Sequence, residues 1–185
     1  MPSANDIRKG QVIKYNGTPH LVMETQHRTP GNLRAFIQIK IKNVINGQII
    51  ERRLSSSDEV EVIDLDRRTM EYLYSDNTGA TFMDIESYDQ MVIPEKVLGE
   101  ALKFLRPNSQ TIVIMYDGNP ISIELPPAVE LTITETTPGI KKATVTNVMK
   151  EATLETGLVT RVPDFIEQGE TIKIATSDGS YMSRA

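Results

Sequence analysis

The chain has 185 residues, a net charge of −5 and no cysteine. The lack of cysteine excludes disulfides, thiolate metal sites and a cysteine nucleophile. A chain of this length can bury one ordinary core or two to three small ones. Its opening residues lack an apolar signal core, and no apolar run approaches the roughly 20 residues that span a bilayer. We therefore expect a cytoplasmic protein without membrane contact.

The negative net charge conceals a basic N-terminal region. Residues 1–53 carry nine basic and three acidic side chains, a net charge of +6. Residues 65–126 carry five and ten, a net charge of −5, and residues 127–185 carry six and eight, a net charge of −2. This asymmetry favours a protein that presents only part of its surface to nucleic acid. On charge alone, solvated side chains with no particular purpose remain the alternative.

Short strands separated by turn residues fill the first third of the chain. Asn-Gly steps at residues 16–17 and 46–47 predict turns between strands, because both residue types tolerate positive φ. Strands of this length and spacing predict a small β-barrel over residues 1–64. The expected strands are at residues 11–15, 19–24, 35–42 and 48–54.

A polar loop at residues 28–34 joins the second and third of these strands. Its Pro-Gly step predicts a hairpin turn, since Pro fixes φ and Gly permits positive φ. The loop lies in the most basic part of an acidic chain, which makes it a candidate working surface. Its tip consists of Pro30, Gly31, Asn32, Leu33 and Arg34.

Basic side chains near this tip are candidates for contacting RNA phosphates. Such contacts give affinity that depends on salt and not on sequence. The chain has four Phe, six Tyr and no Trp, so base stacking on a row of aromatics is disfavoured. If RNA is bound, we expect recognition by shape and backbone. The candidate phosphate contacts are Arg28, Lys40, Lys42, Arg52 and Arg53.

A serine-rich stretch at residues 55–58 precedes a second set of strands, which predicts a central domain over residues 65–126. Residues 94–105 form the one clear helix candidate, with apolar residues at helical spacing and Pro107 beyond its end. The expected strands are at residues 69–74, 80–84, 111–116 and 121–125.

Two consecutive prolines, Pro126 and Pro127, mark the next boundary, because neither can donate to a strand ladder. Residues 127–185 predict a third domain, again mainly β, with a long loop at residues 138–150. The second and third domains have the size and strand density of partly open five-stranded barrels, a fold often used for oligonucleotides. The expected strands are at residues 129–134, 152–154, 158–162 and 170–174.

The chain is poorly equipped for catalysis. His20 and His27 match no zinc spacing, and phosphate-cradling glycine motifs are absent. The neighbouring carboxylates Asp84 and Glu86 are far better explained as a solvated face than as a catalytic pair. We expect no catalytic residue, no metal site and no cofactor.

The C-terminal third carries a specific motif. It reads Lys-Glu-Ala-Thr-Leu-Glu-Thr-Gly at residues 150–157, then Val-Pro-Asp-Phe-Ile at 162–166 and Gly-Glu at 169–170. This pattern closely resembles the signature of bacterial elongation factor P, with Thr160 where the family prefers an aliphatic residue. Residues 6–10, 72–74 and 181–184 are similar to other parts of that family, so the resemblance covers the whole chain.

The resemblance implies a fold and a function. The fold is an N-terminal SH3-like (KOW-like) barrel followed by two OB-fold barrels, arranged as an L that approximates a tRNA. The function is that of a translation elongation factor that binds the ribosome between the peptidyl-tRNA and exit sites. The hairpin tip then reaches the CCA end of the peptidyl-tRNA and stimulates peptide-bond formation at consecutive prolines. Such a factor is a monomer without a small-molecule substrate.

The resemblance also implies RNA contacts in the C-terminal domain. By analogy the loop at residues 138–150 faces the small ribosomal subunit, although it departs from the family's usual Gly-rich form. The candidate contacts are Lys141, Lys142, Tyr181 and Arg184.

The tip departs from the family pattern at Asn32. Many members have a lysine after Pro-Gly that is extended by β-lysylation or a related modification, and others have a rhamnosylated arginine. Asparagine has neither the amine nor the guanidinium, so we expect an unmodified tip. In it Asn32 makes short-range hydrogen bonds and Arg34 a phosphate or base contact. An ordinary solvated cation is the alternative for Arg34.

Two other identities stay open. Residues 1–10, 136–141 and 181–185 also resemble the elongation-factor-P-like paralogues. Those proteins have a longer tip loop, so the shorter loop here favours the factor itself. A general RNA-binding β-barrel protein without a role at the peptidyl-transferase centre is the remaining alternative.

Overall fold

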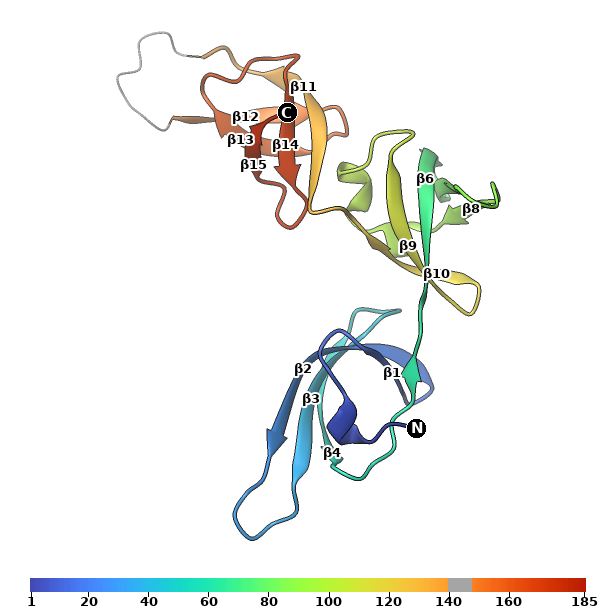
Figure 1. Ribbon diagram of the computed structural model, residues 1–185. Helices are drawn as coiled ribbons and strands as arrows, with labels where there is room; N and C mark the ends of the chain where they lie inside the picture. The colour runs from blue at the N-terminus through green and yellow to red at the C-terminus, as the bar shows by residue number, and fades with distance from the viewer. Residues whose placement is uncertain (140–147) are drawn as a thin grey trace. The chain divides into compact units, whose positions relative to one another are not determined.

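Three five-stranded sheets dominate the computed structural model, which describes residues 1–139 and 148–185 (Figure 1). The expected mainly β fold is therefore confirmed. The chain packs as two compact units, residues 1–67 with 114–122 and residues 68–113 with 123–185. The expected domain boundaries and L-shaped arrangement stay predictions. None of the helices in the described residues is long and apolar enough to cross a membrane.

The first sheet has the strand order β4-β3-β2-β1-β5. Strand β3 alternates strictly, with Ile37, Ile39 and Ile41 buried and the residues between them facing outward. This period-2 pattern is what buries one face of a strand against a core. The elements are η1 (Ala4–Asp6), β1 (Val12–Tyr15), β2 (Thr18–Arg28), β3 (Phe36–Asn43), β4 (Ile49–Ser55) and β5 (Val62–Ile63).

Two local features set the register of this sheet. Asn16 and Gly17 have φ of 50° and 78°, so the predicted Asn-Gly turn between β1 and β2 is confirmed. A bulge between Val22 and Glu24 then shifts the pairing of β2 with β3 by one residue. Beyond the bulge, Glu24, Gln26 and Arg28 face the same side as Lys40, Gln38 and Phe36.

The second sheet has the strand order β10-β9-β6-β7-β8. Its buried side chains include Tyr72 and Phe82, whose ring centroids lie 5.4 Å apart. The strands are β6 (Asp66–Asp76), β7 (Gly79–Asp84), β8 (Gln90–Ile93), β9 (Gln110–Tyr116) and β10 (Asn119–Glu124).

The expectation of one continuous helix over residues 94–105 is wrong. The segment contains a single turn of α-helix, α1 (Glu95–Leu98), and a 3₁₀ turn, η2 (Ala101–Lys103). Between them Gly99 has φ 52° and ψ −125°, a conformation that ends the helix and that only glycine adopts readily. The apolar spacing still buries Leu98 and Leu105, which explains why the periodic pattern suggested a helix.

The third sheet has the strand order β13-β12-β11-β14-β15. Its core includes Leu131, Ile133, Ile172 and Ile174, and Phe104 from the segment before β9 packs against it within the same compact unit. The strands are β11 (Ala128–Thr136), β12 (Met149–Leu154), β13 (Val159–Pro163), β14 (Thr171–Ala175) and β15 (Tyr181–Arg184).

Candidate nucleic-acid interface

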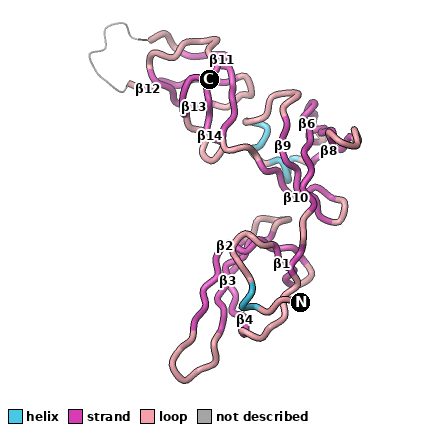
Figure 2. The backbone as a smooth tube through the Cα atoms, in the orientation of Figure 1, coloured by secondary structure: helices cyan, strands magenta, loops and turns pink. Residues whose placement is uncertain are grey.

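The predicted hairpin turn is confirmed as the loop between β2 and β3, which Figure 2 shows as a long loop at the end of two paired strands. The last pair of the ladder joins Arg28 to Phe36. Beyond it the N–H of Leu33 donates to the carbonyl of Pro30 at 2.8 Å, which closes a tight turn. Gly31 and Asn32 occupy the apex of that turn.

The tip offers a basic, exposed surface. The side chains of Asn32, Leu33 and Arg34 are all exposed, and Leu33 retains 73% of its accessible surface. No carboxylate occurs between Arg28 and Phe36. The tip can therefore approach a polyanion without like-charge repulsion, and it holds no side chain suited to general acid–base chemistry at neutral pH.

Next to the tip, two cross-strand rows of polar and aromatic side chains cover the outer face of the sheet. The first row pairs Arg28 with Phe36 and Phe36 with Ser55, and the second pairs Gln26 with Gln38 and Gln38 with Arg53. We call the side chains of Gln26, Arg28, Phe36, Gln38 and Arg53 the tip-proximal face.

Side chains within the tip-proximal face contact one another. The guanidinium carbon of Arg53 lies 5.0 Å from the centroid of the Phe36 ring, a cation–π distance. The Nη2 group of Arg28 donates to Oε1 of Gln26 at 3.0 Å. Both arginines are exposed, and both are neighbours of Phe36, Arg28 across the β2–β3 ladder and Arg53 over the ring.

Arg52 lies on the opposite side of β4 from Arg53. It pairs with Ile39 of the buried face, and its Nε donates to the Tyr15 hydroxyl at 2.9 Å. Its Nη1 also donates to the carbonyl of Glu51 at 2.8 Å. Arg52 therefore fastens β4 to β1 and does not share a face with Arg53.

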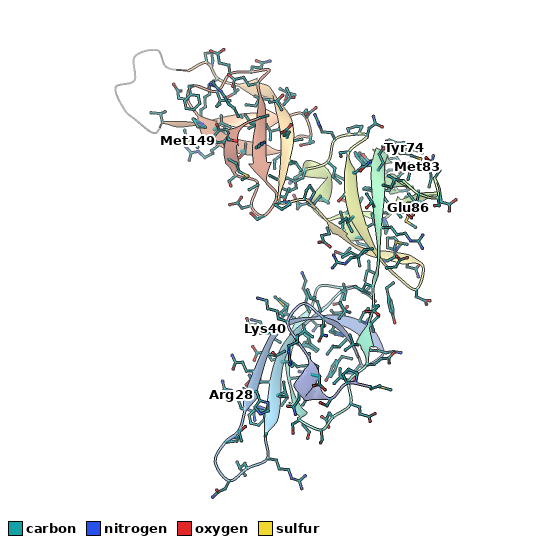
Figure 3. All side chains as sticks on the ribbon, viewed as in Figure 1. Arg28, Lys40, Tyr74, Met83, Glu86 and Met149 are labelled. Carbon is teal, nitrogen blue, oxygen red and sulfur yellow. The ribbon has the colours of Figure 1, made fainter. Side chains whose placement is uncertain are left out.

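The two predicted lysines lie farther from the tip than Arg28, as Figure 3 shows for Lys40. The cross-strand neighbours of Lys40 are Glu24 and Glu51, and carboxylates on both sides offset its positive charge. Lys42 pairs with Leu21 and Ile49 and is exposed. Of the five predicted contacts, Arg28 and Arg53 therefore lie on the tip-proximal face, Arg52 lies on the opposite face of β4, and the two lysines lie farther from the tip.

In the C-terminal domain the predicted contacts are also placed differently. The Tyr181 ring is half-buried against the core of the third sheet. Arg184 donates through Nε and Nη2 to both carboxylate oxygens of Glu170, at 2.9 and 3.2 Å, and its guanidinium lies 5.0 Å from the Phe165 ring. Lys141 and Lys142 lie outside the described residues.

The sequence did not reveal the structural roles of Phe36 and Lys150. The outward positions of β3 were visible as a period-2 pattern, but Phe36 was not identified as a support for an arginine. Lys150 ends the expected loop at residues 138–150 but lies in β12. It is buried, and its ammonium donates to the carbonyl of Thr137 at 2.6 Å.

Asp84 and His20, which the sequence analysis considered for catalysis or metal binding, make hydrogen bonds within the fold. The expectation of a solvated face is wrong for Asp84, which is buried. Its Oδ1 accepts the N–H groups of Glu86 and Ser87 at 2.8 and 3.2 Å, so this carboxylate organises a turn. Those hydrogen bonds, with a smaller contribution from Arg68, lower its pKa. His20 is buried, with Nδ1 3.0 Å from the carbonyl of Thr18. Within residues 1–139 and 148–185, no three His, Cys, Asp or Glu side chains gather to hold a metal ion.

Three family models match successive parts of the chain. They are the KOW-like domain of elongation factor P at residues 3–60, the OB domain of elongation factor P at residues 65–123, and the model described as elongation factor P, C-terminal, at residues 129–184. The expected KOW-like and OB architecture is thereby confirmed.

Proteins named elongation factor P are similar to this chain along its whole length. The elongation factor P of Acidobacterium capsulatum is 47% identical over 182 residues, 98% of each chain. That of Agathobacter rectalis is 42% identical over 184 residues, 100% of each chain. Among solved structures, the translation initiation factor 5A from Methanococcus jannaschii matches in fold, with a TM-score of 0.57 and 20% identity over 66% of this chain and 92% of that one.

The resemblance carried by the C-terminal motif is therefore confirmed by comparisons that span all three sheets. With three domain models matched in order and full-length relatives at 42% and 47% identity, the chain belongs to the elongation factor P family of translation factors.

Proposed function

We propose that this protein binds the ribosome beside the peptidyl-tRNA and stimulates peptide-bond formation when consecutive prolines slow the reaction. The observation that carries the proposal is the exposed tip at the end of β2 and β3, with Arg28 and Arg34 and no carboxylate. A basic projection of this kind suits the phosphate-rich end of a tRNA. The proposed factor is a cytoplasmic monomer that needs no cofactor.

The proposed mechanism is positional. Holding the CCA end of the peptidyl-tRNA in a near-attack geometry removes an entropic barrier, and orientation alone contributes about 7–11 kcal/mol in the best intramolecular cases. The protein supplies no nucleophile, general acid or general base in this mechanism. This fits a tip whose side chains are an amide, an aliphatic group and a guanidinium.

The tip works without a covalent extension in this proposal. Asn32 lies at the apex of the turn closed by Leu33 and Pro30, and its amide offers both donors and an acceptor at short range. Intact-mass measurement of the protein purified from its own host tests this point. We expect the mass of the unmodified chain; added mass on the peptide containing residues 28–34 contradicts it.

A reconstituted translation assay on a message with three consecutive proline codons tests the function. We expect the protein to relieve the stall and Arg34→Ala to lose most of that relief while ribosome binding is largely kept. Glu124→Gln in β10 is a single-charge change in another compact unit and serves as the control. If the wild-type protein binds ribosomes but leaves the stall unchanged, a general RNA-binding role replaces this proposal.

A further inference from the structure

We propose that the tip-proximal face is a binding site for an RNA backbone, with Arg28 and Arg53 as its phosphate contacts. This inference rests on the proposed function, because it assigns a second contact surface to the same hairpin. It also assigns Arg52 and Lys40, which share the strands and the charge, to roles outside that site. The partner is an RNA strand and not a protein.

The first argument is the charge pattern along the sheet. The two rows nearest the tip carry Arg28 and Arg53 and contain no acidic side chain. The third row, Glu24, Lys40 and Glu51, has two acids for one base. Positive potential is therefore concentrated at the tip end of the outer face and reversed one row farther along.

The second argument is how Arg53 is held. Packing over the Phe36 ring restricts the guanidinium, so less side-chain entropy is lost when it binds. Among the described residues Arg53 has no acidic partner within ion-pair distance, and the residue is exposed. A guanidinium that is pre-placed on an exposed residue is suited to a phosphate.

The third argument concerns the groups between the arginines. Gln26 and Gln38 lie opposite each other in the row that ends at Arg53. Amide side chains both donate and accept hydrogen bonds, so they can use both the donor and the acceptor of a ribose 2′-hydroxyl, whereas an ionised carboxylate only accepts. This combination favours RNA over an acidic peptide.

Four matched variants test the assignment in the full-length protein. Arg28→Gln, Arg53→Gln, Arg52→Gln and Lys40→Gln each remove one positive charge from β2, β3 or β4. Binding to purified ribosomes is measured over a salt series. We expect Arg28→Gln and Arg53→Gln to weaken binding about 5- to 10-fold and to lower the slope of log K against log salt by about 0.7–1 each. Arg52→Gln and Lys40→Gln remain within about twofold of wild type, because neither side chain lies at the acid-free end of the face.

Phe36→Leu examines the support of Arg53 without changing charge. We expect a loss of affinity smaller than that of Arg53→Gln, and no further loss when the two changes are combined. If the losses of the two single variants add in the double variant, Phe36 does not act through Arg53. Equal effects of all four charge variants overturn the assignment, since only net charge then matters. Competition of a poly-glutamate peptide equal to that of a single-stranded RNA of the same charge overturns the choice of RNA.

The outcomes separate this inference from the proposed function. If the wild-type protein relieves the proline stall and the four charge variants bind alike, only the tip-proximal site fails. If Arg28→Gln and Arg53→Gln selectively weaken binding and the wild-type protein leaves the stall unchanged, only the proposed function fails.

Discussion

At Arg52 and Arg53, adjacent side chains of the same type meet different surroundings. Arg52 donates to the hydroxyl of Tyr15, whereas Arg53 lies over the ring of Phe36 on the other face of β4. Strand geometry separates neighbours in this way, because successive side chains point to opposite faces. A local count of basic residues therefore overstates the charge that one ligand meets.

Asp84 gives a residue-scale prediction about pH. Its folded-state pKa is lowered from 3.8, chiefly by the N–H groups of Glu86 and Ser87, so its contribution to stability is present above that value and is lost as pH falls through the lowered pKa. Asp84→Asn resembles the protonated carboxyl. We expect the variant to have a lower melting temperature than wild type at pH 7, and the difference to shrink towards pH 2. A constant difference across this range contradicts the linkage.

Thr160 gives a second prediction at this scale. Its buried hydroxyl donates to the carbonyl of Gly179 at 2.7 Å, so Thr160→Val leaves that acceptor unpaired. We expect a loss of about 1–2 kcal/mol in the free energy of unfolding, measured by urea denaturation. Thr134→Val is the matched control, since its hydroxyl makes a similar bond to Thr153 at an exposed site. If Thr160→Val gains stability, burial of the added methyl group stabilises the fold more than the hydrogen bond to Gly179 does.

At the scale of elements, Gly99 separates α1 from η2. Gly99→Ala distinguishes the observed break from a continuous helix by the sign of its effect. In a helix interior, alanine stabilises by about 1 kcal/mol relative to glycine. At φ 52° and ψ −125°, with nothing within 4 Å of an added Cβ, alanine instead costs about 1–3 kcal/mol of backbone strain. We expect a lower melting temperature in a thermal unfolding scan.

Gly79→Ala is the comparison for that variant. Gly79 also has positive φ, but an added Cβ lies 2.2 Å from the carbonyl oxygen of Ile93. We expect a larger loss of stability than in Gly99→Ala, because a steric clash with backbone adds to the strain. If the two variants lose equal stability, the backbone of β7 and β8 moves apart at little cost and removes the clash.

The strands were predictable because two local signals agree in them. Alternation in β3 and the Asn-Gly turn before β2 identified both strands from short segments. The bulge at Met23 was not predictable, since it depends on pairing between β2 and β3. Which of Arg52 and Arg53 shares the outer face with Gln38 depends on the pairing of β3 with β4. The tip was located by its Pro-Gly step, whereas its supporting face arises only from the assembled sheet.

At the scale of the molecule, the segment before β9 joins the second and third sheets within a single compact unit. Phe104 precedes β9 and packs against the third-sheet core, and the hydroxyl of Thr156 donates to the carbonyl of Lys103 at 2.6 Å. Apolar contact between sheets couples their unfolding, because separating them exposes the shared surface to water. We therefore expect residues 68–113, 123–139 and 148–185 to open as one cooperative body in native-state hydrogen exchange.

Phe104→Ala tests that coupling. We expect faster exchange at residues 101–106 and 155–158 and a loss of about 1–3 kcal/mol, since a half-buried ring is removed. Phe165→Ala is the control of the same residue type, because Phe165 is 61% exposed. If Phe104→Ala speeds exchange only in its own segment, the sheets unfold independently. If exchange becomes faster in both segments, the second and third sheets open as one cooperative body.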